Sequence, residues 1–118
     1  MLKPEYNTFL REKLNEIIKT SESGQKEYAI TEDAFSNFNR LSEELGISRE
    51  QILLVYFSKH RDGIISYLKG HKSQREPVQG SIKDCIVYLM LLWAMVEENE
   101  SRDQPESTNS VSFRSNNR

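Results

Sequence analysis

The chain has 118 residues and a formal net charge of −2, and both values restrict the classes of protein to which it can belong. A chain of this length forms one domain, and the near-neutral charge excludes the basic excess of non-specific nucleic-acid binders. The single cysteine, Cys85, excludes an intramolecular disulfide and a cysteine-based metal pair. The N-terminus is too charged for a signal peptide, and the longest apolar run, residues 85–96, is shorter than the ~20 residues of a membrane span.

The first predicted helix runs from Pro4 to about Ser21. Pro4 suits a first-turn position, and the apolar side chains that follow it recur at helical spacing. Residues 21–30 interrupt this pattern with Gly24 and small polar side chains, which predicts a loop. The apolar stripe of the helix consists of Tyr6, Leu10, Leu14, Ile17 and Ile18.

Two further helices are predicted in the middle of the chain. The second begins at Thr31, a hydroxyl cap followed by two acids, and stops at Gly46. The third opens with a capping box formed by Ser48 and Gln51 and continues to Lys69. The apolar stripe of the second helix contains Ala34, Phe35, Phe38, Leu41 and Leu45.

The last predicted helix is the most apolar segment of the chain. Residues 70–80, which contain Pro77, predict a loop, and Ser81 with Asp84 starts the helix, which reaches about Glu98. This helix is apolar nearly all round, so it should be covered on all sides. Three modest helices cannot cover it fully, and we therefore expect part of it to face a second copy of the chain.

The predicted fold is all-α, a small four-helix bundle that oligomerises through its apolar C-terminal helix. Residues 1–98 form the single helical domain, and residues 99–118 form a disordered tail with almost no apolar content. A soluble, cytoplasmic protein with no membrane partner follows from these features.

The third helix carries the first candidate site, a charged block followed by a helix-weakening glycine. Lys59 and Asp62 are neighbours on the helix surface, and Ser66 lies one turn beyond Asp62. Gly63 costs about 1 kcal/mol relative to alanine, and close approach of another helix or of a ligand compensates such a cost. The block is either a surface ion pair beside a packing glycine or a pocket wall that also offers the imidazole of His60.

The second candidate site lies at the start of the last helix. Asp84 and Tyr88 are one turn apart on the same face, and the preceding loop supplies His71, Lys72 and Arg75. Basic side chains beside an open helix N-terminus favour an anion such as phosphate. The alternative is that Ser81 and Asp84 only cap the helix and that the preceding loop is solvated.

Metal-dependent hydrolysis has weaker support. Two-metal chemistry needs several carboxylates that converge from neighbouring helical turns. Glu43 and Glu44 are adjacent in sequence, so they diverge around a helix, and Asp62 and Asp84 each have no carboxylate one turn away. Glu97 and Glu100 are spaced to converge, but they lie where the last helix is expected to fray.

Residues 34–92 resemble a family of small phage and prophage all-α proteins, the nucleotide-modification-associated domains, which are similar in pattern to the all-α nucleotide pyrophosphohydrolases. The resemblance rests on an "NF" pair, a "KH" pair, a Glu-Pro loop and a "D…YL.LL" segment. In this chain these are Asn37 and Phe38, Lys59 and His60, Glu76 and Pro77, and Asp84 with the segment 88–92.

The resemblance implies a helical bundle, dimers and a nucleotide or nucleotide-derived ligand near Lys59, His60, Asp62 and Asp84. The chain departs from the pattern at Ser81, because the family pattern has an arginine at this position, just before Ile82. The acid pairs of the pyrophosphohydrolases are also missing. Recognition without turnover is compatible with both departures, whereas catalysis is put in doubt.

Three functions follow as hypotheses. The first is a phage-type sponge that binds an immune messenger between protomers, in the cytoplasm of an infected bacterium and without a cofactor. Lys59, Lys72 and Arg75 would then meet phosphates, while Tyr56 or Tyr88 stacks on a base or a ribose. The second is a Mg²⁺-dependent nucleotide pyrophosphohydrolase with Asp62, Asp84 and a glutamate of the second helix on the metal. The third is a protein interaction module.

Overall fold

The computed structural model describes residues 1–28, 32–71 and 77–103, and all side chains within these ranges except those of 25–28. The described chain forms four helices, and no strand occurs within these ranges. The prediction of an all-α fold is therefore confirmed. The helices are α1 (Lys3–Tyr28), α2 (Ser36–Leu45), α3 (Arg49–Leu68) and α4 (Val78–Asp103).

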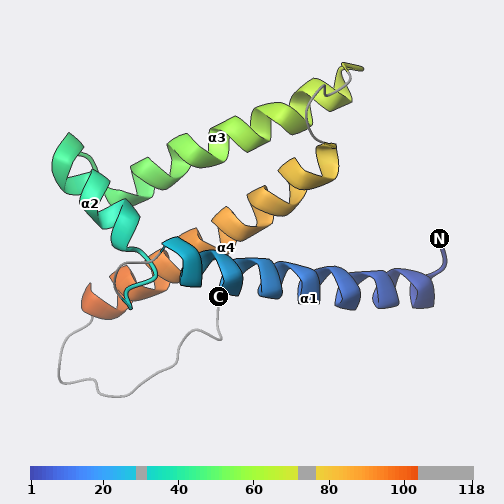
Figure 1. Ribbon diagram of the computed structural model, residues 1–118, viewed down its shortest axis with the longest axis horizontal. Coiled ribbons are helices and arrows are strands. Elements are labelled where there is room, and N and C mark those ends of the chain that lie inside the picture. Colours follow the sequence, from blue (N-terminus) through green and yellow to red (C-terminus); the bar gives the residue numbers. More distant parts are fainter. Residues whose placement is uncertain (29–31, 72–76, 104–118) are drawn as a thin grey trace.

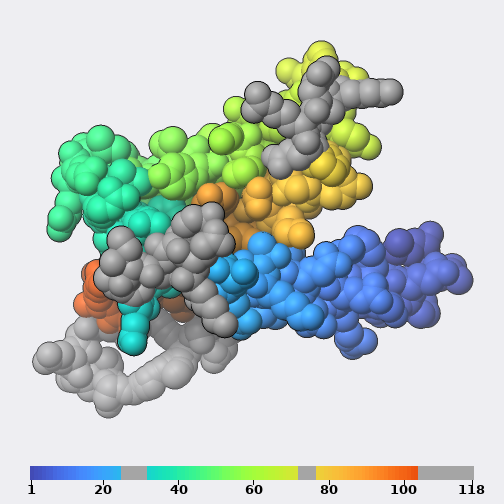
Figure 2. Space-filling view, viewed as in Figure 1, coloured from blue at the N-terminus to red at the C-terminus, as the bar shows by residue number. Residues whose placement is uncertain are grey.

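The four helices are unequally packed (Figure 1). The most extensive contact between two helices is that of α3 with α4, which run antiparallel, and α2 packs against α3. The helix α1 touches α4 near its own C-terminal end, where Ile17, Ser21 and Gly24 are partly buried. Its N-terminal half projects away from the other helices, as the blue part of Figure 2 shows.

The core lies where α2, α3 and α4 meet. Leu53 and Met95 are the most completely buried of its side chains, with 1% and 0% of their surface exposed. Partly buried apolar side chains surround this centre. The buried cluster consists of Phe35, Phe38, Ile52, Leu53 and Met95, and the side chains packed against it are Leu41, Phe57, Tyr88, Leu91 and Leu92.

The predicted boundaries of α3 are confirmed. The Ser48 side chain accepts a hydrogen bond from the Gln51 backbone N–H, and the Gln51 side chain accepts one from the Ser48 N–H. Two orphan donors of the first turn are satisfied in this way. Gly46 follows α2 with a φ of 73°, the left-handed conformation that only glycine adopts without strain.

The first two helices differ from the prediction at their facing ends. The helix α1 continues through Gly24 to Tyr28, so the loop predicted from residue 21 is wrong. The helix α2 begins at Ser36, not at Thr31, which lies outside the described residues. The carboxylate of Asp33 explains the later start, because it accepts hydrogen bonds from the Phe35 N–H and the Asn39 amide.

The last helix also extends beyond its predicted limits. It begins at Val78, so Ser81 is inside the helix and does not cap it. Pro77 immediately precedes the helix, and its carbonyl accepts the Gly80 N–H, which is a favourable way to open a helix. The helix ends at Asp103, five residues past the predicted boundary at Glu98. The remaining tail, 104–118, lies outside the described residues.

One side of α4 is not covered by the rest of the fold. By length and composition alone, α4 is the one described helix that is able to cross a membrane, a test that core helices of water-soluble proteins also pass. The opposite side of the same helix is packed into the core through Met95. The uncovered side chains are Ile82, Ile86, Leu89, Met90, Trp93 and Val96.

Candidate functional site

His60 lies between α3 and α4 and contacts two side chains of α4. Its Nδ1 lies 3.3 Å from Oδ2 of Asp84, and its ring stacks on that of Tyr88 with centroids 5.5 Å apart and an interplanar angle of 24°. Asp84 and Tyr88 are one helical turn apart, so both reach the same imidazole. The structure therefore brings together three of the predicted site residues.

The stacked pair belongs to a longer row of rings. The Tyr88 centroid is 6.2 Å from that of Tyr56, which in turn is 5.8 Å from that of Phe38 in the core. Burial, with the nearby charges of Asp84 and Tyr56, raises the pKa of the Tyr88 phenol. Tyr88 therefore remains a neutral hydroxyl near pH 7, able both to donate and to accept a hydrogen bond.

The site is open to solvent at one edge. The side chain of His60 is 19% exposed and that of Asp84 is 41% exposed. Because Nδ1 of His60 is engaged by Asp84, Nε2 is the ring nitrogen that an incoming group would meet. The combination offers a ring face, an imidazole edge and a carboxylate at the junction of two helices.

Gly63 explains how α3 and α4 approach so closely beside this site. A Cβ atom at this position would lie 2.7 Å from Ser81 Oγ and 3.4 Å from Ser81 Cβ. Of the two partners expected for Gly63, another helix or a ligand, the structure shows the helix. Ser81 is thus a packing residue of α4.

The rest of the charged block on α3 points elsewhere. Lys59 and Asp62 are both exposed, and the carboxylate of Asp62 lies 3.5 Å from Arg61 instead of pairing with Lys59. Arg61 is solvent-facing, as expected, with 57% of its side chain exposed. Ser66 is partly buried one turn further along α3.

The predicted basic loop cannot be placed against the site. Lys72 and Arg75 lie outside the described residues. His71 is exposed, and its backbone N–H bonds the Ser66 carbonyl at the end of α3. The sequence pattern placed the N-terminal amides of the last helix at Ser81. Since α4 begins at Val78, these amides lie about one turn earlier.

No group of three or more histidine, cysteine or acidic side chains able to hold a metal occurs among the residues that the structure describes. Glu97 and Glu100 lie inside α4, so the expectation that this part of the helix frays is wrong. Cys85 is buried, and its pKa is raised by burial and by the charge of Asp84, as suits a packed thiol.

A second polar cluster, which the sequence did not reveal, joins the start of α3 to the end of α4. The guanidinium of Arg49 lies 2.8 Å from Glu98 and 3.3 Å from Glu50, and it donates to Asn99 at 2.9 Å. It also lies 5.0 Å from the centre of the Phe35 ring. We call the four residues Arg49, Glu50, Glu98 and Asn99 the clamp.

Electrostatics hold the clamp in its charged form. Burial alone would lower the pKa of Arg49, but the hydrogen bonds and charges of Glu98 and Glu50 raise it. Burial alone would raise the pKa of Glu50, but hydrogen bonds from Asn99, from its own backbone and from Arg49 lower it. The clamp partners on the two helices are 49 and 50 residues apart, so no local spacing in the sequence predicts the clamp.

No family model, curated protein or solved structure matches this chain. The assignment of a function therefore depends on the sites themselves.

Proposed function

We propose that the protein binds a nucleotide or a nucleotide-derived messenger at the junction of α3 and α4 and retains it without turnover. The observation that carries the proposal is the His60 ring, whose Nδ1 lies beside Asp84 and whose face stacks on Tyr88. The proposal has the protein act as a sponge, which lowers the concentration of the free ligand.

Ring chemistry supports a nucleobase as part of the ligand. Stacking of a base on an aromatic side chain is worth about 1–3 kcal/mol, and His60, Tyr88 and Tyr56 provide neighbouring rings at one place. The exposed edge of Asp84 is an acceptor suited to an amino group or a ribose hydroxyl. Lys59 is exposed one position before His60 and points away from the ring pair, so it would meet only a phosphate that extends beyond the rings.

The kinds of group brought together favour retention over hydrolysis. The site combines rings with one imidazole and one carboxylate, a set suited to stacking and hydrogen bonding. A Mg²⁺-dependent pyrophosphohydrolase requires several carboxylates on its metals, so it remains the alternative with less support. The resemblance to the nucleotide-modification-associated domains is the reason to place the ligand among nucleotides and the protein in a phage context.

A sponge must bind more tightly than the receptor it competes with. A messenger that acts at micromolar concentration needs a sponge with a Kd near 1 nM, or about −12 kcal/mol. Two stacked rings and a few hydrogen bonds at one half-open site do not reach that value. The proposal therefore requires further contacts to the ligand beyond those of this site.

The experiment is a retention assay on the purified protein. The chain is incubated with Mg²⁺ and separately with ATP, GTP, UTP, CTP and a set of cyclic dinucleotides, desalted, denatured and analysed by chromatography. Recovery of an intact nucleotide supports the sponge, and release of pyrophosphate supports the enzyme instead. No retention and no turnover across the panel would refute both.

Matched variants locate the ligand. His60→Ala and Tyr88→Leu should each lower retention at least tenfold, because each removes one ring of the stacked pair. His71→Ala is the control, since it removes the other histidine of the chain, which is exposed beyond the end of α3. An equal loss in the control would show that the stacked pair does not bind the ligand.

A protein interaction module is the second candidate function. It is favoured by the large apolar side chains that remain exposed along α1 and α4. The two functions are compatible, because the exposed faces and the His60 site use different sides of α4.

A further inference from the structure

Two apolar stripes lie uncovered on this protein. The α4 stripe consists of Ile82, Ile86, Leu89, Met90, Trp93 and Val96, and the α1 stripe of Tyr6, Phe9, Leu10, Leu14 and Ile18. We propose that a second copy of the chain covers both stripes and forms a symmetric dimer. The proposal does not depend on the ligand site.

The spacing of the α4 stripe is that of a helix–helix seam. Ile82, Ile86, Leu89, Trp93 and Val96 follow one another at steps of four, three, four and three residues. This 3.5-residue average keeps side chains facing a partner helix that crosses at a small angle. Each of them is 37–62% exposed, so the seam has no partner within the part of the chain that the structure describes.

The α1 stripe is covered along only part of its length. Ile17, Ser21 and Gly24 share the face of Tyr6 and Leu10, and these later positions are partly buried near α4. Further toward the N-terminus α1 leaves the fold, and Tyr6, Leu10 and Leu14 are 39–50% exposed. This half of α1 therefore gains no stability from packing against the other described helices.

The uncovered area is sufficient for a dimer. Aromatic side chains bury ~150–250 Å² each, so at the low end of that range eleven large apolar side chains at about half exposure, three of them aromatic, leave on the order of 800 Å² per chain. A stable interface of standard size buries about 800 Å² per partner. A symmetric dimer uses the same surface on both copies, so both stripes would be buried on each of the two chains.

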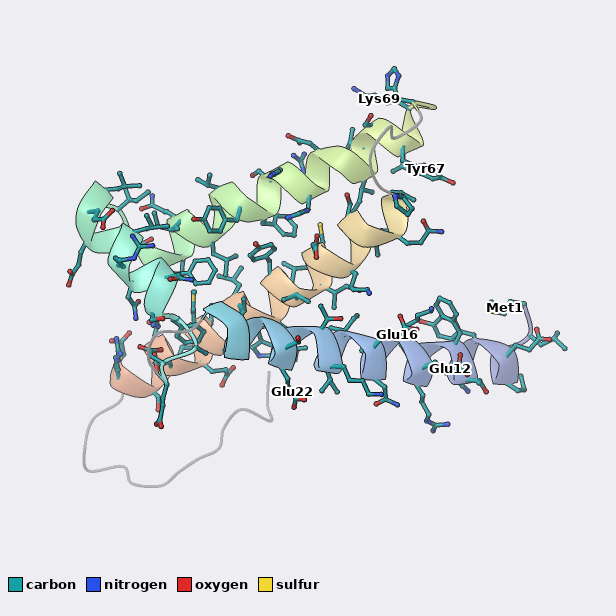
Figure 3. The ribbon with its side chains drawn as sticks, viewed as in Figure 1. Met1, Glu12, Glu16, Glu22, Tyr67 and Lys69 are labelled. Atoms are coloured by element: carbon teal, nitrogen blue, oxygen red, sulfur yellow. The ribbon has the colours of Figure 1, made fainter. Side chains whose placement is uncertain are left out.

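Charge favours a second copy as the occupant. Acidic side chains lie along the projecting helix, where Figure 3 labels Glu12, Glu16 and Glu22, and basic side chains alternate with them at Arg11 and Lys13. Because charges of both signs alternate along α1, two copies of it present no single-sign field that would repel a partner. The net charge of −2 gives little repulsion between the copies.

A lipid bilayer is the competing occupant, because α4 passes the length and composition test for a membrane span. Insertion would pull α4 away from α3. It would expose the core around Met95, place Asp84 in hydrocarbon, where an unpaired charge is costly, and separate Glu98 and Asn99 from Arg49. A dimer buries the α4 stripe while the contacts between α3 and α4 stay intact.

The test is the oligomeric state of the full chain by sedimentation equilibrium, with Trp93 as an internal reporter. Trp93 is the only tryptophan and is 62% exposed in the single chain. We expect a dimer at micromolar concentration whose tryptophan emission shifts to longer wavelength on dilution. A monomer with dilution-independent emission would overturn the proposal, and so would binding to phosphatidylcholine vesicles in place of self-association.

Variants at exposed positions separate the interface from folding. Leu89→Glu on α4 and Leu14→Glu on α1 should each raise the dimer dissociation constant at least about 100-fold, because each buries two unpaired charges per dimer. Leu68→Glu, 75% exposed at the end of α3, is the matched control and should leave the dimer intact. Stripe variants that remain dimeric, or a control that dissociates equally, would refute the assignment.

Discussion

The α3–α4 pair and α1 are built from similar apolar side chains, yet only the pair buries them. In the pair, Leu53 is 1% and Met95 0% exposed, and the clamp fastens the end opposite Gly63. Along α1, no side chain of residues 1–24 is buried, and Leu10 is 39% exposed. Helical spacing alone therefore does not decide burial; the presence of a facing helix does.

The difference separates what the chain stabilises by itself from what needs a partner. The α3–α4 pair with α2 has a core, satisfied helix ends and a polar clamp. The projecting half of α1 has helix propensity, an exposed Lys13–Glu16 ion pair and little else. Exposed pairs of this kind contribute only about 0.3–0.5 kcal/mol. We expect the two regions to respond very differently to equivalent substitutions.

The largest effect is expected from a buried leucine of α3. Leu53→Ala should lower the free energy of unfolding by about 2–5 kcal/mol, because it removes buried methylene groups and leaves a cavity. The next residue, Leu54, is 57% exposed and provides the control, since Leu54→Ala should cost less than about 0.5 kcal/mol. Chemical denaturation followed by circular dichroism measures both, and equal losses would contradict the location of the core.

The clamp should give the next largest effect. Arg49→Ala removes charged hydrogen bonds to Glu98 and Asn99 from a side chain only 11% exposed, and we expect a loss of about 2 kcal/mol. Arg40 forms an exposed pair with Glu44 on α2, so Arg40→Ala should cost less than about 0.5 kcal/mol.

A double-mutant cycle isolates the pairwise contribution of the clamp. If Arg49 and Glu98 act together, Arg49→Ala combined with Glu98→Ala should cost less than the sum of the single changes. Additive losses would show that the 2.8 Å contact contributes nothing of its own to stability.

Two of the helical glycines, Gly63 in α3 and Gly24 in α1, compare the regions directly. Gly24→Ala meets no atom within 4 Å, so it should gain up to about 1 kcal/mol of helix propensity, visible as increased helicity. Gly63→Ala should show no such gain, because its Cβ would lie 2.7 Å from Ser81 Oγ. In a Ser81→Ala background the gain at position 63 should return, and its failure to return would disprove this contact.

The sequence predicted the type of all four elements but not all of their limits. Strong local signals, such as the Ser48–Gln51 box and Gly46, set the ends that were right. The errors at the end of α1 and the start of α4 share a cause, because the predicted loops contained or ended at glycines that lie within helices, Gly24 and Gly80. A single glycine costs about 1 kcal/mol, which the rest of a long helix can offset.

The candidate site was predictable as a residue set but not as a geometry. His60, Asp84 and Tyr88 were all named from the sequence, yet the direction of the imidazole depends on how α3 meets α4. That meeting is set by Gly63 against Ser81, which are eighteen residues apart. The clamp depends on equally distant partners. Periodicity within one helix carries no information about such contacts between helices.

The smallest effect expected is the pH response of the clamp through Glu50. The pKa of this carboxyl is lower in the folded chain than its ordinary value of 4.5, because hydrogen bonds from Asn99, its backbone and Arg49 outweigh burial. Protons therefore bind more readily to the unfolded chain. The stability from Glu50 is complete above pH 4.5 and is lost as pH falls through the lower folded pKa.

Glu50→Gln tests this linkage, because it removes the titration and retains the shape of the side chain. Between pH 7 and pH 3 the difference in unfolding free energy between wild type and variant should shrink by about 0.5 kcal/mol, the size of one partly exposed ion pair. Glu43→Gln, at an exposed position of α2, should run parallel to the wild type throughout. Because α1 has no part in the clamp, the helicity of its projecting half should not follow the Glu50 titration. An α1 signal that does follow it would mean that the two regions unfold as one unit, and the contrast between them would then be wrong.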